Sequence, residues 1–291
     1  MQLLIQSESP VTPQAVAQLS AVLQATPSSG TGDPCLTFSL AAAPAPETRA
    51  AVRDICHQHQ CDHGWISKRR VLASYGLLVF DMDSTLINIE CIDELADCVG
   101  RKAEVAAITE RAMRGEEMDY DQSMIARVQL LRGLAARDLK RVYDERLTIT
   151  PGARQLVQQA RRAGLKTAII SGGFDYFADR LRAELEIDVA ISNRLSMEHG
   201  YVTGGMDNPP VNAQVKASTV KSLCAEWGVA LSDTIVAGDG ANDLQMMAIA
   251  GVSVGYRPKQ IVAEKVDIQI AHLALDSVLG YLTPNGFAAR V

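Results

Sequence analysis

Three short segments of this chain are rich in carboxylate, hydroxyl and glycine residues, and each follows a run of apolar residues. The apolar runs cover residues 76–80, 166–170 and 234–237, and they are typical of strands that are buried on both faces. The segments that follow are Asp81-Met82-Asp83-Ser84-Thr85, Ser171-Gly172-Gly173 and Gly238-Asp239-Gly240-Ala241-Asn242-Asp243. Because ligands of open α/β sheets bind beyond the carboxyl ends of the strands, we expect the three segments to form one site.

The first and third segments predict a metal site. Asp81 and Asp83 stand two residues apart at a strand end, so they point to the same side and repel each other. Asp239 supplies a third carboxylate from another strand end. A hard cation with oxygen ligands offsets such repulsion, and Mg²⁺ is the usual choice when a substrate brings phosphate oxygens. The alternative is that each aspartate only caps the helix that follows, but capping does not require the accompanying hydroxyl and glycine residues.

Two further features are candidates for binding an anion. Ser171-Gly172-Gly173 is expected to open a helix after its strand, where backbone N–H groups and the helix dipole favour an anion. Lys216 lies on a helix-like stretch, where a lone lysine is ordinarily a surface charge. Neither feature specifies an anion site by itself.

The chain around these segments predicts two domains. Residues 1–71 alternate short strand and helix patterns, which predicts a small N-terminal α+β domain. Residues 72–291 predict an α/β domain with a doubly wound parallel sheet, because apolar runs alternate with helical segments. The stretch from about 88 to 148 is helical and charged, which predicts a helical cap inserted after the first core strand. Residues 190–203, with His199-Gly200 at their middle, predict a β-hairpin.

The composition favours a globular protein that acts on a small molecule. Of the 291 residues, 47% are hydrophobic and 21% are charged, which provides enough apolar material for a packed core. The net charge of -6 argues against nucleic-acid binding, which needs a basic surface. We expect a cytoplasmic protein with no membrane partner, because there is no signal-like or membrane-spanning apolar stretch and the six scattered cysteines fit reduced thiols. The sequence allows a homodimer but does not specify one.

Taken in order, these segments resemble the four motifs of the haloacid-dehalogenase-like superfamily. The matching residues are Asp81-x-Asp83-Ser84-Thr85, Ser171-Gly172-Gly173-Phe174, Lys216 and Gly238-Asp239-Gly240-Ala241-Asn242-Asp243. The resemblance implies a Rossmann-like core and a Mg²⁺-dependent reaction through a phosphorylated aspartate. In that reaction Asp81 is the nucleophile, and Asp83 protonates the leaving oxygen and later deprotonates the attacking water.

The same resemblance implies how the remaining motif residues act. Asp81, Asp239 and the backbone carbonyl of Asp83 would bind the metal, with Asp243 acting through water. The residues that would hold the phosphoryl oxygens are Ser171, Gly172 and Lys216.

Within the superfamily, the predicted cap is similar to that of the phosphoserine phosphatases. The similarity lies in Glu90-Cys91-Ile92-Asp93-Glu94, in Thr109-Glu110-Arg111-Ala112-Met113-Arg114-Gly115 and in Arg127-Val128. It implies hydrolysis of O-phospho-L-serine to serine and phosphate, the last step of serine biosynthesis. Glu90 would face the ammonium of the substrate and Arg127 its carboxylate, with Asn242 close to the ligand. Two alternatives stay open: a phosphatase or phosphotransferase for another small phosphorylated metabolite, and a binding or regulatory relative without turnover.

One other cluster could bind a metal. The segment Cys56-His57-Gln58-His59-Gln60-Cys61-Asp62-His63 places three histidines beside two cysteines, which are ligands that zinc accepts. Its spacing matches no standard zinc finger, so we favour a polar helix end followed by a strand.

Overall fold

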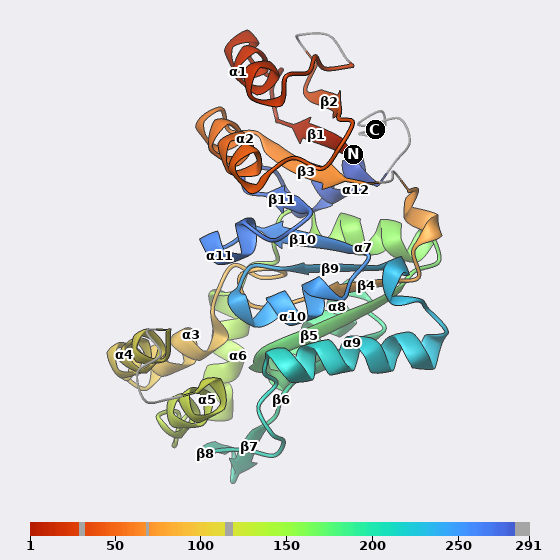
Figure 1. Ribbon diagram of the computed structural model, residues 1–291. Coiled ribbons are helices and arrows are strands. Elements are labelled where there is room, and N and C mark those ends of the chain that lie inside the picture. The colour runs from red at the N-terminus through yellow and green to blue at the C-terminus, as the bar shows by residue number, and fades with distance from the viewer. Residues whose placement is uncertain (29–32, 68–69, 114–118, 283–291) are drawn as a thin grey trace.

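A mostly parallel sheet runs through the molecule (Figure 1). The computed structural model describes residues 1–28, 33–67, 70–113 and 119–282, and within these ranges the sheet has nine strands. From one edge to the other they are β2 (Cys35–Ser39), β1 (Gln2–Gln6), β3 (Asp62–Ile66), β11 (Ile268–Ile270), β10 (Val252–Tyr256), β9 (Thr234–Gly238), β4 (Leu77–Phe80), β5 (Lys166–Phe174) and β6 (Val189–Asn193). The six strands from β11 to β6 are mutually parallel, whereas β1, β2 and β3 pair in antiparallel fashion.

Helices cover both faces of the parallel part. Leu78 and Phe80 of β4 share a hydrophobic cluster with α7 (Ala153–Arg162) and α8 (Asp175–Leu185). Leu77 and Val79, whose side chains alternate to the other face, share a second cluster with α9 (Ala213–Trp227) and α10 (Leu244–Ala248). In Figure 1, α9 and α10 lie in front of the sheet. The predicted doubly wound α/β fold is confirmed.

Four helices follow β4 and form the cap. They are α3 (Cys91–Cys98), α4 (Lys102–Met113), α5 (Tyr120–Gln129) and α6 (Ala136–Glu145). At the base of this insertion Ile87 and Ile149 form an antiparallel bridge, so the two connecting segments run side by side. The charged helical pattern arises because each helix buries one side only; in α6, for example, Leu139 and Val142 are buried.

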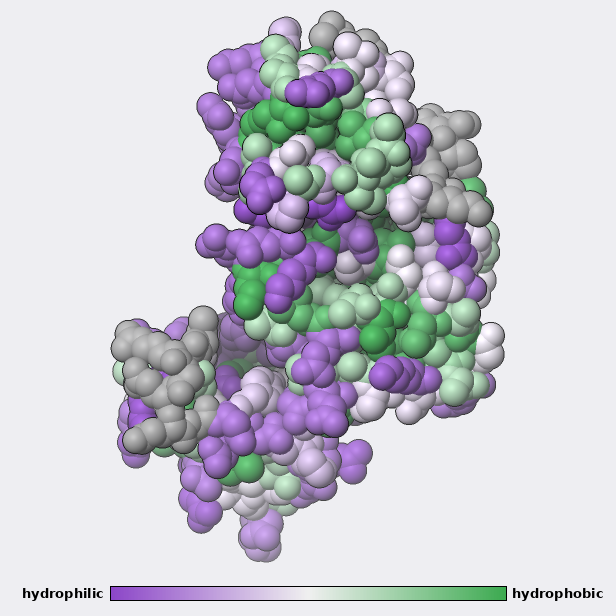
Figure 2. Space-filling view, viewed as in Figure 1, coloured by the Kyte–Doolittle hydropathy of each residue, from purple (hydrophilic) through white to green (hydrophobic). Residues whose placement is uncertain are grey.

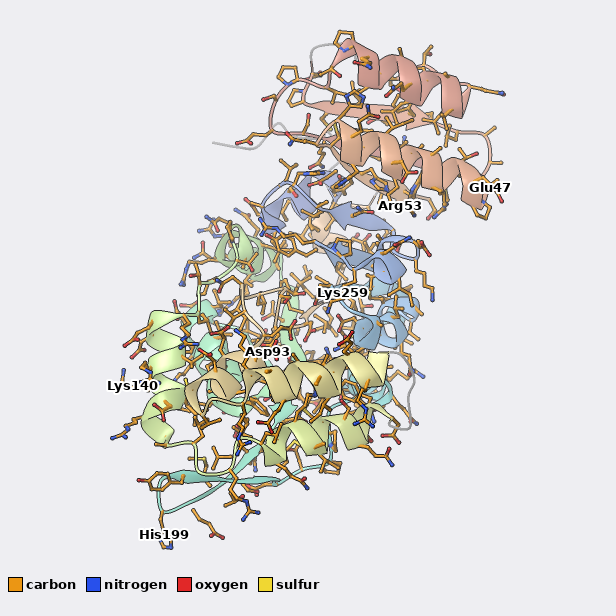
Figure 3. The ribbon with its side chains drawn as sticks, turned by 90° about the vertical axis from the view of Figure 1, so that its left-hand side faces the viewer. Glu47, Arg53, Asp93, Lys140, His199 and Lys259 are labelled. Carbon is orange, nitrogen blue, oxygen red and sulfur yellow. The ribbon has the colours of Figure 1, made fainter. Side chains whose placement is uncertain are left out.

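The predicted hairpin is present with different bounds, because residues 190–193 belong to the core strand β6. It consists of β7 (Leu195–Glu198) and β8 (Tyr201–Met206), and its turn residues His199 and Gly200 both have positive φ, 50° and 83°. Two consecutive residues with positive φ match the right-handed twist of a tight hairpin. The hairpin extends from the end of β6 and packs β8 against α5, with His199 at its tip (Figure 3).

The N-terminal unit follows its predicted order of strands and helices. Its helices are α1 (Pro13–Leu23) and α2 (Pro46–Gln58), and its own hydrophobic cluster includes Leu3, Leu36 and Trp65. However, β3 pairs with β11, so the sheet continues from this unit into the core (Figure 1). No local pattern could indicate a pairing between segments about 200 residues apart. The domain division at residue 71 stays a prediction.

Asp62 at the start of β3 strengthens this junction. Its carboxylate accepts hydrogen bonds from the backbone N–H groups of Ala271, His272 and Leu273, at 2.8, 3.0 and 2.9 Å. The side chain is fully buried. Three otherwise unpaired donors of the core are therefore satisfied by one residue of the N-terminal unit.

The nearby cysteines and histidines make contacts of other kinds. His57 stacks on His272 at 5.6 Å between ring centroids, and His59 Nε2 lies 2.8 Å from Gln18 Oε1. Within the described ranges, no group of three potential ligands that could hold a metal forms in this segment. The helix end followed by a strand, which we favoured, is what the structure contains.

The remaining helical segments are short. They are α11 (Gln260–Ala263), α12 (Val278–Tyr281) and the turns Leu72–Ser74, Leu231–Asp233, Ala241–Asp243 and Leu275–Ser277. None of the helices in the described part of the chain combines the length and hydrophobicity that crossing a membrane requires.

Asp62→Ala tests the contribution of the junction. The substitution leaves three buried N–H groups without an acceptor, so we expect the free energy of unfolding to fall by about 3 kcal/mol or more. Urea denaturation at neutral pH measures the change. Asp54→Ala on the exposed side of α2 is the matched control, and an Asp62→Ala loss no larger than that of the control would contradict the assignment.

Candidate active site

Three carboxylates meet at the carboxyl ends of two neighbouring strands. Asp81 follows β4 and Asp239 follows β9, and these strands pair in parallel with Phe80 opposite Ala237. Asp243 lies in the helical turn after β9. One oxygen of each carboxylate lies within 4.8 Å of the others, and all three residues are buried. In the part of the chain that the structure describes, no other trio of potential metal ligands is this close.

Lys216 lies between two of these carboxylates. Its Nζ is 2.8 Å from Asp81 Oδ1 and 2.7 Å from Asp243 Oδ1, and its side chain is fully buried. Burial alone would lower the pKa of this ammonium, but Asp243 and Asp81 raise it above its usual value. The lysine is therefore an internal cation and not the surface charge that its position on a helix suggested. It is placed by α9, whose N-cap Asn212 accepts the N–H of Val215 at 2.9 Å.

Asp243 also shapes the loop after β9. Its Oδ2 accepts the N–H groups of Asp239 and Gly240, at 3.2 and 3.1 Å. A Cβ at position 238 would collide with this carboxylate, which explains the glycine there. Burial and then Asp81 raise the pKa of Asp243 to about 7, against the opposing effect of Lys216.

The donor set fits a hard divalent cation. Three buried carboxylates face one buried ammonium, which leaves an excess of negative charge among the described side chains. A second cation, Lys259, is largely exposed and reaches Asp239 Oδ2 at 3.3 Å. Burial and Asp81 raise the pKa of Asp239, so its charged form is disfavoured without a further cation. Oxygen ligands and excess negative charge suit Mg²⁺.

Asp83 has different surroundings from Asp81. Its Oδ2 accepts the N–H of Cys91 at 3.3 Å, and its buried Oδ1 has no hydrogen-bond partner in the described ranges. Burial, followed by the neighbouring Glu90 and Asp81, raises the pKa of Asp83 well above its usual value. This carboxyl group is therefore suited to holding a proton.

The structure corrects the expectation for Ser171-Gly172-Gly173. These residues lie within β5, which continues to Phe174, and α8 begins only at Asp175. This segment therefore does not supply a helix N-terminus to the site. Instead, the register between β5 and β6 shifts between Ile170 and Phe174, and Gly173 of this segment lies close to Asp83. Ser171 Oγ accepts the N–H of Gly173 at 3.0 Å.

A cavity of about 660 Å³ lies between these strand ends and the cap. Its lining from the core includes Asp81, Asp83, Ser171, Gly172, Asp239, Asn242 and Lys259, and its lining from the cap side includes Glu90, Asp93, Tyr120 and Arg127. In Figure 2 the indentation between core and cap, on the left of the view, is bordered by hydrophilic residues. Figure 3 labels Lys259 and Asp93 on its opposite sides.

Glu90 and Arg127 thus face the same cavity as the motif residues of the core. Glu90 Oε1 accepts a hydrogen bond from Ser84 Oγ at 2.8 Å, and Arg127 Nε donates to the carbonyl of Ser123 at 3.3 Å. Among the described residues, the guanidinium uses one of its five donors in a hydrogen bond. Arg114 and Gly115, part of the cap segment singled out in the sequence, lie outside the described residues.

Sequence analysis missed three residues of this site. Thr85 Oγ1 lies 3.5 Å from Asp239 Oδ1. Thr85 belongs to the segment that begins with Asp81, but its hydroxyl was assigned no role from the sequence. Lys259 follows β10, so the rule that ligands bind beyond strand ends would have found it. Tyr120 begins α5, and no signal in the sequence distinguishes it from an ordinary helix residue.

The family model and the most similar sequences agree on one family of hydrolases. The model of the haloacid dehalogenase-like hydrolases matches residues 78–248. A phosphoserine phosphatase of Polaromonas sp. is 48% identical over 212 residues, which is 72% of this chain and 90% of that protein. A phosphoserine phosphatase of Haemophilus influenzae is 44% identical and covers 74% of this chain, with 68% of its own length matched.

Two solved structures resemble nearly the whole chain, and a third resembles about three quarters of it. A haloacid dehalogenase family hydrolase from Salmonella enterica serovar Typhi covers 98% of this chain, and 99% of that protein is matched, with a TM-score of 0.84 and 30% identity. A probable phosphoserine phosphatase from Vibrio cholerae covers 97%, and 85% of it is matched, with a TM-score of 0.79 and 33% identity. A substrate-bound phosphoserine phosphatase covers 75%, and all of it is matched, with a TM-score of 0.66 and 33% identity.

Lys216→Met tests the charge balance of the site. Removing the buried ammonium leaves Asp81 and Asp243 without their cation, so without added metal we expect the free energy of unfolding to fall by about 3–5 kcal/mol. The loss in the free energy of unfolding should shrink as the pH falls, because Asp81 and Asp243 no longer repel each other once they are protonated. Denaturation at several pH values in EDTA measures both effects. Lys221→Met, at an exposed position of the same helix, is the control, and equal losses in the two variants would refute this account.

Proposed function

This chain belongs to the phosphoserine phosphatase family of the haloacid dehalogenase-like hydrolases, and we propose that it hydrolyses O-phospho-L-serine to serine and phosphate. The observation that carries the proposal is the arrangement of charge around one cavity. Asp81, Asp83 and Asp239 line its core side, where the buried Lys216 is paired with Asp81, and Glu90 and Arg127 line its cap side. A substrate with a phosphate at one end and an amino-acid group at the other complements this arrangement.

Asp81 is the proposed nucleophile. One of its oxygens attacks phosphorus, the bond to the serine oxygen breaks, and an aspartyl-phosphate forms; water then attacks this phosphorus and releases phosphate and the free carboxylate. The ion pair with Lys216 and the hydrogen bond from the Met82 N–H, at 2.7 Å, orient the carboxylate for this attack.

Asp83 is the proposed proton carrier. Its proton passes to the departing serine oxygen in the first step, and its carboxylate accepts a proton from the attacking water in the second. The raised pKa of Asp83, caused first by burial and then by Glu90, supports a protonated starting form. Gly173 leaves room for this carboxyl group, because a Cβ there would lie 3.0 Å from Asp83 Oδ2.

We propose Mg²⁺ as the cofactor. Asp81, Asp239 and the backbone carbonyl of Asp83 would hold it, with Asp243 acting through water. When bound, the ion neutralises the charge of the phosphoryl oxygens and of the nucleophile. The excess of buried carboxylates over cations supports this part of the proposal.

The remaining contacts would position the substrate. Ser171, the Gly172 N–H and Lys216 would bind phosphoryl oxygens, and Asn242, which lines the cavity, would lie close to them. On the cap side Arg127 would bind the substrate carboxylate and Glu90 its ammonium. None of the six cysteines, all of them within the described residues, forms a disulfide, which supports a cytoplasmic location.

Asp81→Asn tests the nucleophile. An amide cannot form the acyl-phosphate, so we expect turnover of phosphoserine to disappear while the far-ultraviolet circular dichroism stays that of the wild type. Asp179→Asn, at an exposed position of α8, should keep full activity. Turnover by purified Asp81→Asn at a rate near that of the wild type would overturn the mechanism.

Arg127→Ala tests the substrate. Losing a charge-assisted contact to the carboxylate should lower kcat/KM for phosphoserine by about 10- to 150-fold, which corresponds to about 1.5–3 kcal/mol. An aryl phosphate has no carboxylate, so its hydrolysis should barely change. Arg132→Ala, with no place in the cavity lining, is the control. Equal losses on both substrates would indicate a general structural role and favour a phosphatase for another metabolite.

A further inference from the structure

We propose that the hydroxyl of Tyr120 binds the phosphoryl group of the substrate and donates a hydrogen bond to it from the cap side. The inference rests on the proposed function for the phosphoryl site, but not on phosphoserine as the substrate. It deepens that function by adding a cap residue to a subsite otherwise built entirely from the core. Four observations carry it: the anchoring of α5, the place of the hydroxyl, its unused proton and the donor count of Lys216.

The start of α5 is held firmly in position. Asp119 accepts the N–H of Gln122 at 2.8 Å, and the Gln122 side chain accepts the N–H of Asp119 at 3.2 Å, which forms a reciprocal capping box. Tyr120 is the first residue inside this cap. Its backbone is thus part of a capped helix start.

The same helix start is bonded to the core. Both carboxylate oxygens of Asp121 lie within hydrogen-bond distance of Asn212 Nδ2, at 3.0 and 3.1 Å. Asn212 is also the N-cap of α9, the helix that carries Lys216. The first turn of α5 is therefore positioned relative to the first turn of α9, and Tyr120 relative to Lys216.

The Tyr120 hydroxyl lies directly against Gly172. A Cβ placed on Gly172 would collide with this oxygen, so the two groups are in close contact across the boundary between cap and core. Lys216, Arg127 and Asp81 are near enough to influence the hydroxyl. Burial raises its pKa above the usual value, and the two cations oppose this rise. The oxygen thus borders the loop and the lysine that are proposed to hold the phosphoryl oxygens.

The hydroxyl proton has no acceptor among the residues that the structure describes. Over residues 1–28, 33–67, 70–113 and 119–282, Tyr120 makes no side-chain hydrogen bond, although the residue lines the cavity. An O–H group in a largely buried position usually finds an acceptor. A phosphoryl oxygen held beside Gly172 would supply one.

The core alone offers few donors to the phosphoryl group. An ammonium has three N–H donors, and two of those of Lys216 are directed at Asp81 and Asp243. Only one remains for the substrate, together with the Ser171 hydroxyl and backbone N–H groups. A donor from Tyr120 would satisfy an oxygen on the side away from the carboxylates.

Tyr120→Phe tests the inference because it removes only the hydroxyl and keeps the ring. We expect kcat/KM to fall about 10-fold or more for both phosphoserine and an aryl phosphate, since a hydrogen bond to a charged group is lost. The inhibition constant of inorganic phosphate should rise several-fold, while the melting temperature stays within about 2 °C of the wild type. Tyr143→Phe, which loses a hydroxyl bonded to Glu184 outside the cavity, should change none of the kinetic constants.

The outcomes separate this inference from the proposed function. Unchanged kcat/KM values and an unchanged phosphate inhibition constant in Tyr120→Phe would overturn the inference. A loss confined to phosphoserine, with phosphate inhibition unaffected, would also overturn it, because the hydroxyl would then serve the amino-acid end. If the wild type hydrolyses the aryl phosphate but not phosphoserine, the proposed substrate fails, and parallel losses on the aryl phosphate and inorganic phosphate would still support Tyr120.

Discussion

The architecture of the site depends on keeping three carboxylates together inside the protein. Asp81, Asp239 and Asp243 are buried, where water does not screen their mutual repulsion. Lys216 offsets part of this repulsion, and the fold must bring the lysine and the carboxylates together. The strands β4 and β9 must be neighbours, and α9 must cover the face from which its lysine reaches between them. The glycine at position 238 is needed because Asp243 occupies the space of a side chain there.

The cap borders the same cavity but contributes none of the three carboxylates and not Lys216. Its helices follow β4 and lie apart from the sheet (Figure 1), and Glu90 and Arg127 line the cavity from the cap side. The hydrogen bonds from Asn212 to Asp121 and from Ser84 to Glu90 join the two parts next to the cavity. The core therefore supplies the charged centre, and the cap supplies the opposite side of the cavity.

Much of the fold was predictable because it depends on local pattern. Apolar runs that end in glycine or aspartate indicated the strands, and charge at helical spacing indicated the cap. The prediction for Ser171-Gly172-Gly173 was wrong in one respect: the strand continues to Phe174 because its pairing with β6 resumes after an irregularity. The pairing of β3 with β11 was not predicted at all. Both depend on partner strands, whose identity a single segment does not specify.

For the site, the sequence by itself determined which residues stand at strand ends and hence that Asp81, Asp83 and Asp239 share one edge of a sheet. It also identified the family through the order of the motifs. The tertiary structure decided that Lys216 is buried between carboxylates, that Lys259 reaches Asp239, and that Tyr120 lies against Gly172. These three residues sit on ordinary helix or loop positions, where the same side chain is usually exposed to water. Their surroundings come from segments far away in the chain, and burial and neighbouring charge act only once those segments have packed together.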